Sequence, residues 1–128
     1  MDTIYLPVTF TFISLYAISL PILSGWVGLY RGKVNILRSH GNDPILFKRI
    51  RIYGNLIEVA PAFALMLAVS EFLGLTHNWL WAAVGTFLVG RFLHYCLFDS
   101  KARGAAMGLT LFPAALLGIW SLLKIWMF

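Results

Sequence analysis

The chain has 128 residues, of which 60% are hydrophobic and only 12% are charged, and its formal charge at neutral pH is +5. A soluble domain carries about 25% charged residues, so this composition excludes an ordinary soluble domain and indicates contact with lipid. The basic residues lie at the ends of apolar runs, which is typical of membrane proteins and argues against nucleic-acid binding. A single cysteine, Cys96, and three dispersed histidines predict neither an internal disulfide nor a metal site.

Four apolar runs follow one another along the chain, and each is close to the roughly 20 residues that a helix needs to cross a bilayer. We expect spans at about 4–30, 44–74, 78–98 and 104–126, forming one domain over residues 1–128. The second and third connections are short, which favours antiparallel neighbours. The sequence therefore predicts an all-α integral membrane protein, built as a bundle of four transmembrane helices.

The first connection ends in the sequence GNDP, which is typical of a helix start. Asp43 suits the N-cap position, and Pro44 suits the first position of a helix. A helix that begins there runs for roughly 30 residues, or about 45 Å. This length exceeds the hydrocarbon thickness of about 30 Å, so we expect its first turns to lie among the lipid headgroups.

The distribution of basic residues predicts the orientation in the membrane. Six lie in the first connection and the start of the second span: Arg31, Lys33, Arg38, Lys48, Arg49 and Arg51. Three more lie around the third connection: Arg91, Lys101 and Arg103. Only Lys124 is left for the opposite side, so the positive-inside rule predicts cytoplasmic connections one and three, with both termini outside. In a bacterium the membrane would be the inner, cytoplasmic one.

A stripe of polar residues runs along the start of the second span. Lys48, Arg51, Asn55 and Glu58 are spaced by three, four and three residues, so they share one face of the helix, whereas Arg49 points elsewhere. An ionisable side chain that faces lipid at depth costs several kcal/mol. We therefore expect Glu58 to face the interior of the bundle or a wet cavity.

The third span carries a second polar stripe. Arg91, His94 and Tyr95 lie on one helical face, and a turn near residue 76 would place His94 level with Glu58. Two interpretations stay open. The charges could neutralise one another and fix helix packing, or the excess of cations could bind an anion, either a lipid phosphate or a soluble carboxylate.

Two polar residues further along the chain receive simpler interpretations. Glu71 is expected to lie at the outer membrane interface, near the aromatic belt of Trp79 and Trp81. His77 is expected to be a solvated residue of the turn between the second and third spans.

The pattern R-x-x-x-N-x-x-E-x-x-P, formed by Arg51, Asn55, Glu58 and Pro61, resembles the signature of the MAPEG family. These are membrane-associated proteins in eicosanoid and glutathione metabolism, and the chain is most similar to small bacterial-type members. The four spans agree with this resemblance, as do three further arginines near the span ends: Arg31, Arg91 and Arg103.

The resemblance implies a homotrimer of four-helix bundles that binds glutathione, as a co-substrate, between adjacent subunits near the cytoplasmic side. The residues expected to bind glutathione are Lys48, Arg51, Asn55, Glu58, Arg91, His94 and Tyr95. Arg103 and Arg31 are the catalytic candidates, because a nearby guanidinium favours the thiolate. The chain departs from the pattern of glutathione-using members at three positions where they tend to have tyrosine: Val59, His94 and Phe98.

The leading functional hypothesis is a membrane-bound transferase or peroxidase that reacts glutathione with a lipophilic electrophile. The alternative is a non-catalytic membrane protein of the same type that binds an anionic lipid or a protein partner through the same basic pocket. The expected partners are further copies of the chain, membrane lipids and a lipophilic small molecule, and not nucleic acid.

Overall fold

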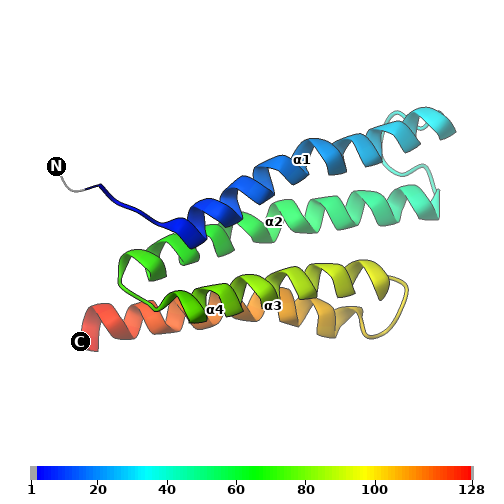
Figure 1. Cartoon of the computed structure of the whole chain (residues 1–128). Coiled ribbons are helices and arrows are strands. Elements are labelled where there is room, and N and C mark those ends of the chain that lie inside the picture. Colours follow the sequence, from blue (N-terminus) through cyan, green and yellow to red (C-terminus); the bar gives the residue numbers. More distant parts are fainter. Residues whose placement is uncertain (1–2, 128) are drawn as a thin grey trace.

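The computed structural model describes residues 3–127, and all regular secondary structure in this range is helical. The four helices are α1 (Pro7–Val34), α2 (Pro44–Phe72), α3 (His77–Cys96) and α4 (Arg103–Met127). They form an elongated bundle (Figure 1). The predicted all-α, four-helix fold is therefore confirmed.

Successive helices run in opposite directions, so the bundle has two distinct ends (Figure 1). The α1–α2 and α3–α4 connections share one end, which we call the basic end because residues 31–51 and 101–103 there carry most of the Lys and Arg residues. The short α2–α3 turn lies at the opposite end, together with the start of α1 and the end of α4. Helices α2 and α3 each pack against all three other helices, whereas α1 and α4 are not in contact within the described residues.

Three phenylalanines from three helices form the centre of the bundle. Phe63 of α2 and Phe87 of α3 stack with ring centroids 4.6 Å apart, and Phe12 of α1 packs edge-on against them at 4.9 and 5.3 Å. Stacked and edge-to-face pairs of this kind stabilise a core by more than their buried area alone. This aromatic contact holds α1 against the α2–α3 pair.

Helices α3 and α4 approach each other most closely at Gly90. A Cβ atom at this position would lie 2.7 Å from the Thr110 Oγ1 and 2.8 Å from the Thr110 backbone nitrogen. Small residues permit such close backbone contact between membrane helices. Gly90 therefore sets the spacing between α3 and α4.

The predicted start of α2 is confirmed. Asp43 is the N-cap, and its carboxylate accepts hydrogen bonds of 2.9 Å from the backbone N–H groups of Ile45 and Leu46, with Pro44 as the first helical residue. The Tyr30 hydroxyl of α1 donates to the same carboxylate at 3.1 Å. The hydrogen bond from Leu46 is the main cause that lowers the pKa of Asp43 below its ordinary value.

The start of α1 is capped by a residue from another helix. The Glu71 carboxylate of α2 accepts hydrogen bonds from the backbone N–H groups of Val8 and Thr9, at 3.0 and 2.9 Å. Its side chain is only 3% exposed, so Glu71 is a buried helix cap. Its expected position at the outer membrane interface stays a prediction, and Glu71 does lie one residue before the end of α2. A carboxylate is stabilised at a helix N-terminus by the unpaired N–H groups and the helix dipole. His77 is the first residue of α3, not a turn residue, and its Nε2 lies 3.5 Å from Glu71.

The outer surface of the bundle is largely apolar. Helices α1, α2 and α4 are long and apolar enough to cross a membrane, whereas α3, which includes Arg91 and His94, falls short of that criterion. Large hydrophobic side chains are exposed on every helix, among them Leu29, Leu65, Phe92 and Leu116. A surface of this kind needs contact with lipid or with other protein, as in an integral membrane protein.

Candidate functional site

The motif residues of α2 form a connected polar group near the basic end. Arg51 donates a hydrogen bond of 3.1 Å to the Asn55 Oδ1, and its other terminal nitrogen lies 3.9 Å from the Glu58 Oε1. The three side chains thus share one face of the helix, as their spacing predicted. Arg51 and Glu58 have side chains that are 42% and 61% exposed, so both have atoms free to contact a ligand.

Glu58 does not face the interior of the bundle, which was the first of the two positions that we expected; the second, a wet cavity, stays a prediction. The α2 residues that pack into the core are Ile52, Ala60, Phe63 and Leu67, and they occupy a different face of the helix from Glu58. Glu58 lies on the outer surface of the chain, beside the exposed Ile57. A carboxylate exposed to hydrocarbon costs several kcal/mol, so this face of α2 needs polar or protein cover in the membrane.

Asn55 connects the exposed group to a buried histidine. Its Nδ2 lies 3.4 Å from the Nε2 of His94, which is only 1% exposed. Since the Asn55 Oδ1 accepts from Arg51, its amide NH₂ points at His94, and a neutral His94 would accept at Nε2 and carry its proton on Nδ1. Arg51, Asn55 and His94 therefore form one chain of polar contacts from the surface to the interior.

His94 faces Asn55, and not Glu58 as the expected turn position predicted. Helix α2 ends at Phe72 and α3 begins at His77, so the turn is centred between residues 74 and 75 and not at residue 76. When the assumed centre of a hairpin turn is wrong by a given number of residues, the predicted partner on the opposite helix is wrong by twice that number. This shifts the partner of His94 by nearly one helical turn, from Glu58 to Asn55.

Aromatic rings at the end of α3 support two of the predicted basic residues. The Lys48 Nζ lies 5.1 Å from the centre of the Tyr95 ring and 3.7 Å from the Asp99 Oδ2. The Arg103 guanidinium, at the start of α4, lies 5.2 Å from the centre of the buried Phe98 ring. Cations bind favourably over the faces of such rings. Lys48 and Arg103 are thus held near the connection between α3 and α4.

Several positive charges surround the interior histidine. Three guanidinium groups lie within electrostatic range of the His94 ring, those of Arg51, Arg91 and Arg103. Of the nearby acids, Glu58 lies next to Arg51 and Asp99 next to Lys48. The site therefore carries an excess of positive charge and favours an anionic ligand.

Arg31 does not join this group of residues. Its guanidinium donates to the backbone carbonyls of Ile36 and Ser39, at 3.3 and 2.7 Å, within the first connection. These carbonyls lie in a segment with positive φ angles at Asn35 and Ser39, which non-glycine residues adopt only with support. Arg31 is therefore a structural residue of the α1–α2 connection in this chain.

Arg91 faces α1 and lines a pocket of about 450 Å³ between α1, α2 and α3. Within the described residues, neither of its terminal nitrogens has a hydrogen-bond partner, although both are buried. Arg91 thus lies near the motif residues, but it lines a pocket to which Arg51, Asn55 and Glu58 do not contribute.

Arg49 contributes a contact that the sequence pattern did not reveal. Its guanidinium lies over the rings of Trp26 and Tyr30, at 4.8 and 4.7 Å, and donates a 2.9 Å hydrogen bond to the Trp26 carbonyl. Arg49 points away from the motif face, as expected, and fixes α1 to the basic end of α2. Its position one residue after Lys48 was the available signal for this different direction.

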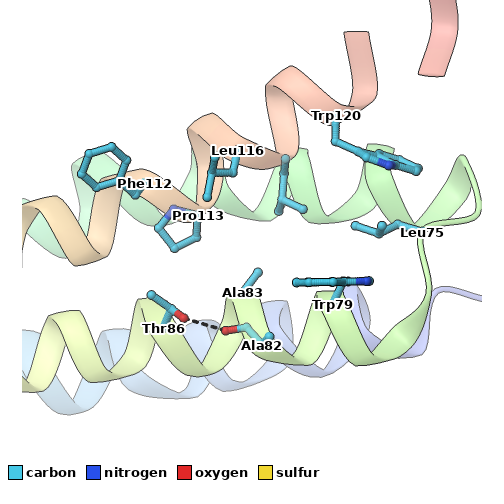
Figure 2. A pocket seen from close by; sticks show the side chains of 10 residues that line it. Leu75, Trp79, Ala82, Ala83, Thr86, Phe112, Pro113, Leu116 and Trp120 are labelled. Carbon is cyan, nitrogen blue, oxygen red and sulfur yellow. Dashed lines mark hydrogen bonds between the residues drawn. The ribbon is translucent and has the colours of Figure 1, made fainter. Parts of the chain in front are cut away.

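A second pocket lies near the opposite end, between α3 and α4 (Figure 2). Its volume is about 460 Å³, and Trp79, Phe112 and Trp120 are among its lining residues. The one hydroxyl in its lining, that of Thr86, donates to the Ala82 carbonyl at 2.8 Å. The lining of this pocket is mostly apolar, and it includes none of the residues of the polar site.

The fold and the site together define an integral membrane protein that is a four-helix bundle with a polar motif on its second helix. Compared with known protein families, residues 9–123 match the model of the MAPEG family, which covers nearly the whole chain. The chain therefore belongs to the MAPEG family, as its motif indicated. No curated protein and no solved structure matches it.

Proposed function

We propose that this protein is a glutathione-dependent membrane enzyme, a transferase or peroxidase that acts on lipophilic electrophiles. The observation that carries the proposal is the Arg51–Asn55–Glu58 group, which is internally connected yet exposed on the surface of α2. The membership in a family whose members include glutathione transferases and peroxidases supports it. The group extends from Arg51, two turns from the basic end, to Glu58 at the middle of α2, so a water-soluble peptide would reach it from the basic end.

The chemistry of glutathione suits the charges of the site. The Glu58 carboxylate would accept hydrogen bonds from the α-amino group of the tripeptide, and Arg51 would pair with one of its two carboxylates. The Asn55 amide is already fixed between Arg51 and His94, so it presents a rigid polar contact. Lys48, at the edge of this surface, and Tyr95 beneath it would complete the contacts to the second carboxylate.

Arg103 is the residue that we assign to thiol activation. Its side chain is exposed at the first position of α4 and has no acidic neighbour among the described contacts. A free thiol has a pKa of about 8.5, and a nearby guanidinium favours the thiolate, which is the nucleophile. Arg31 is less suited to this role, because its guanidinium is engaged by the Ile36 and Ser39 carbonyls.

The proposal includes self-association in the membrane, as a homotrimer. Glu58 lies on the outer surface of a helix that spans the membrane, where lipid alone would leave the carboxylate poorly solvated. A neighbouring copy of the chain would cover this face of α2 and form the other wall of the glutathione site. The basic end would face the cytoplasm, following the positive-inside rule.

The test is a calorimetric titration of the purified protein with glutathione. Wild-type protein should show saturable binding, and Arg51→Ala should weaken it by about 10- to 100-fold, as expected for a charged hydrogen bond worth roughly 1.5–3 kcal/mol. Arg38→Ala is the matched control, since Arg38 is an exposed cation in the first connection. Absence of heat at millimolar glutathione from folded protein would reject the proposal.

The role of Arg103 needs a separate measurement. Arg103→Ala should lower turnover of a lipophilic electrophile by about 100-fold, while glutathione affinity changes little, because the residue acts on the thiol. Thiolate absorbance in the ultraviolet, followed as a function of pH, should shift to higher pH in this variant. Unchanged thiolate absorbance would show that Arg103 is not the activating group.

A further inference from the structure

The Arg91 side chain poses an electrostatic problem that the chain itself does not solve. Its two terminal nitrogens are buried and, within residues 3–127, lack hydrogen-bond partners. An arginine remains charged under all ordinary conditions. A buried cation without partners is strongly unfavourable, so this position requires an anion or another acceptor.

The acidic side chains that the structure describes are all engaged elsewhere. Asp43 caps α2, and Glu71 caps α1. Glu58 lies beside Arg51, and Asp99 lies beside Lys48. Among residues 3–127, no carboxylate is therefore paired with Arg91, which leaves room for a compensating group from a bound molecule.

The pocket that Arg91 lines is otherwise mostly apolar and opens at the exposed apolar surface of the chain. Helix α1 contributes Ile22, Leu23 and Trp26, and α2 contributes Ile52 and Leu56. At its mouth, Ile22 is 65% exposed and Phe92 is 66% exposed. Since these apolar residues meet the hydrocarbon of the bilayer, a molecule that enters the pocket comes from the membrane and not from water.

Two further cations border the same pocket. Trp26 and Tyr95 both line it, and each ring carries a cation over its face: Arg49 lies 4.8 Å from Trp26, and Lys48 lies 5.1 Å from Tyr95. Both cations belong to the first turns of α2, on the side of the basic end. Only Lys48 has an acidic neighbour, Asp99, so the surroundings of the pocket are positive.

We propose that this pocket binds an anionic phospholipid of the membrane. Its phosphate would pair with the Arg91 guanidinium in a bidentate manner, once the side chain turns its two buried, unpartnered nitrogens toward the pocket. Its headgroup would lie toward Lys48 and Arg49, and one acyl chain would follow the apolar lining past Leu23 and Leu56. The site adjoins the proposed glutathione site and shares Lys48 and Tyr95 with it. It differs in its centre, because Arg91 lines the pocket whereas Arg51, Asn55 and Glu58 do not.

An anionic lipid fits better than a soluble anion or a neutral lipid. The lining would bury the apolar chain of a lipid but would leave most polar groups of a soluble anion without partners. A zwitterionic headgroup would bring its own cation next to Lys48 and Arg49. The volume of about 450 Å³ is within the range of small-molecule sites, roughly 300–1,000 Å³, and suits one acyl chain.

The experiment is native mass spectrometry of the detergent-solubilised protein with phosphatidylglycerol or phosphatidylcholine of the same acyl composition. Wild-type protein should retain phosphatidylglycerol about tenfold more than phosphatidylcholine, as expected for a charged hydrogen bond. Arg91→Gln should abolish this preference. Leu23→Trp, which fills the pocket without changing charge, should abolish retention of phosphatidylglycerol. Lys124→Gln, near the opposite end, is the control and should retain the wild-type preference.

The outcomes separate this proposal from its rivals. Equal retention of the two lipids by wild-type protein, or an unchanged preference in both Arg91→Gln and Leu23→Trp, would overturn it. Displacement of phosphatidylglycerol by millimolar inorganic phosphate would instead indicate a simple anion site. Circular dichroism verifies folding, and if Arg91→Gln does not fold, Leu23→Trp decides. Glutathione binding is measured on the same Leu23→Trp protein and should be unchanged, so failure of one proposal does not decide the other.

Discussion

Helix α2 contains two glutamates, one at its middle and one near its end, and the two carboxylates have opposite surroundings. Glu71, near the α2–α3 turn, is buried and accepts two backbone hydrogen bonds of 2.9–3.0 Å from the start of α1. Glu58, at the middle of α2, has a side chain that is 61% exposed and lies 3.9 Å from Arg51. Both are acidic residues in an apolar helix, and sequence position alone does not distinguish their roles.

The difference shows how a structural carboxylate can be told from one available to a ligand. The Glu71 oxygens are satisfied by backbone groups that have no other partner, so the chain uses this charge entirely for its own fold. The Glu58 oxygens keep unused hydrogen-bonding capacity at the protein surface. An acid that is incompletely paired in a spanning helix is the better candidate for binding.

Substitution of each glutamate should have the largest effect and tests directly whether the two carboxylates differ in role. Glu71→Ala leaves the Val8 and Thr9 N–H groups unpaired in a buried position, and we expect it to lower the free energy of unfolding by about 3 kcal/mol. Glu58→Ala removes only an exposed ion pair, so its cost should stay below about 1 kcal/mol. Thermal unfolding in detergent, followed by circular dichroism, measures both.

Glutathione binding should respond in the reverse order. Glu58→Ala should abolish the calorimetric signal of glutathione, whereas Glu71→Ala, measured well below its melting temperature, should keep it. If both variants lose stability equally and neither changes glutathione binding, Glu58 is a packing residue. The difference in exposure between Glu58 and Glu71 then has no functional meaning.

The comparison also explains which features the sequence could predict. The four helices, the Asp43 cap and the shared face of Arg51, Asn55 and Glu58 follow from local spacing, and all three predictions were confirmed. Local spacing depends only on the geometry of a single helix, which is the same in every protein. These features therefore needed no knowledge of tertiary contacts.

The features that the sequence did not reveal depend on contacts between distant residues. Glu71 caps a helix that begins 64 positions earlier, at Pro7, so no local pattern marks it as a cap. The direction of Glu58 depends on which face of α2 packs against the core. Because α2 has apolar residues on every face, its sequence pattern does not identify the core-facing side. The partner of His94 depended on the position of a four-residue turn, where a small error is doubled.

A second substitution tests the close contact between α3 and α4 at Gly90. Gly90→Ala places a methyl group 2.8 Å from the Thr110 backbone nitrogen, which cannot move without shifting α4. We expect a loss of roughly 1–3 kcal/mol, as for other overpacked contacts. Gly85→Ala is the matched control on α3, because nothing lies within 4 Å of its added methyl group. It should be neutral or stabilising, since Ala favours helix more than Gly does. Equal melting temperatures for the two variants would contradict the close contact.

The smallest expected effect concerns Asp43, the carboxylate at the basic end that resembles Glu71 in capping a helix. The Leu46 N–H holds the pKa of Asp43 below its ordinary value, so the folded state favours the ionised form. This contribution to stability is complete above the ordinary pKa near 4 and is lost as pH falls through the lower pKa of the folded state. Melting temperatures between pH 6 and pH 3 should therefore fall less steeply in Asp43→Asn than in wild type, because asparagine caps a helix without titrating. Arg38→Ala serves as a control for changes in surface charge. Identical pH slopes in wild type and Asp43→Asn would show that ionisation of Asp43 contributes no measurable stability.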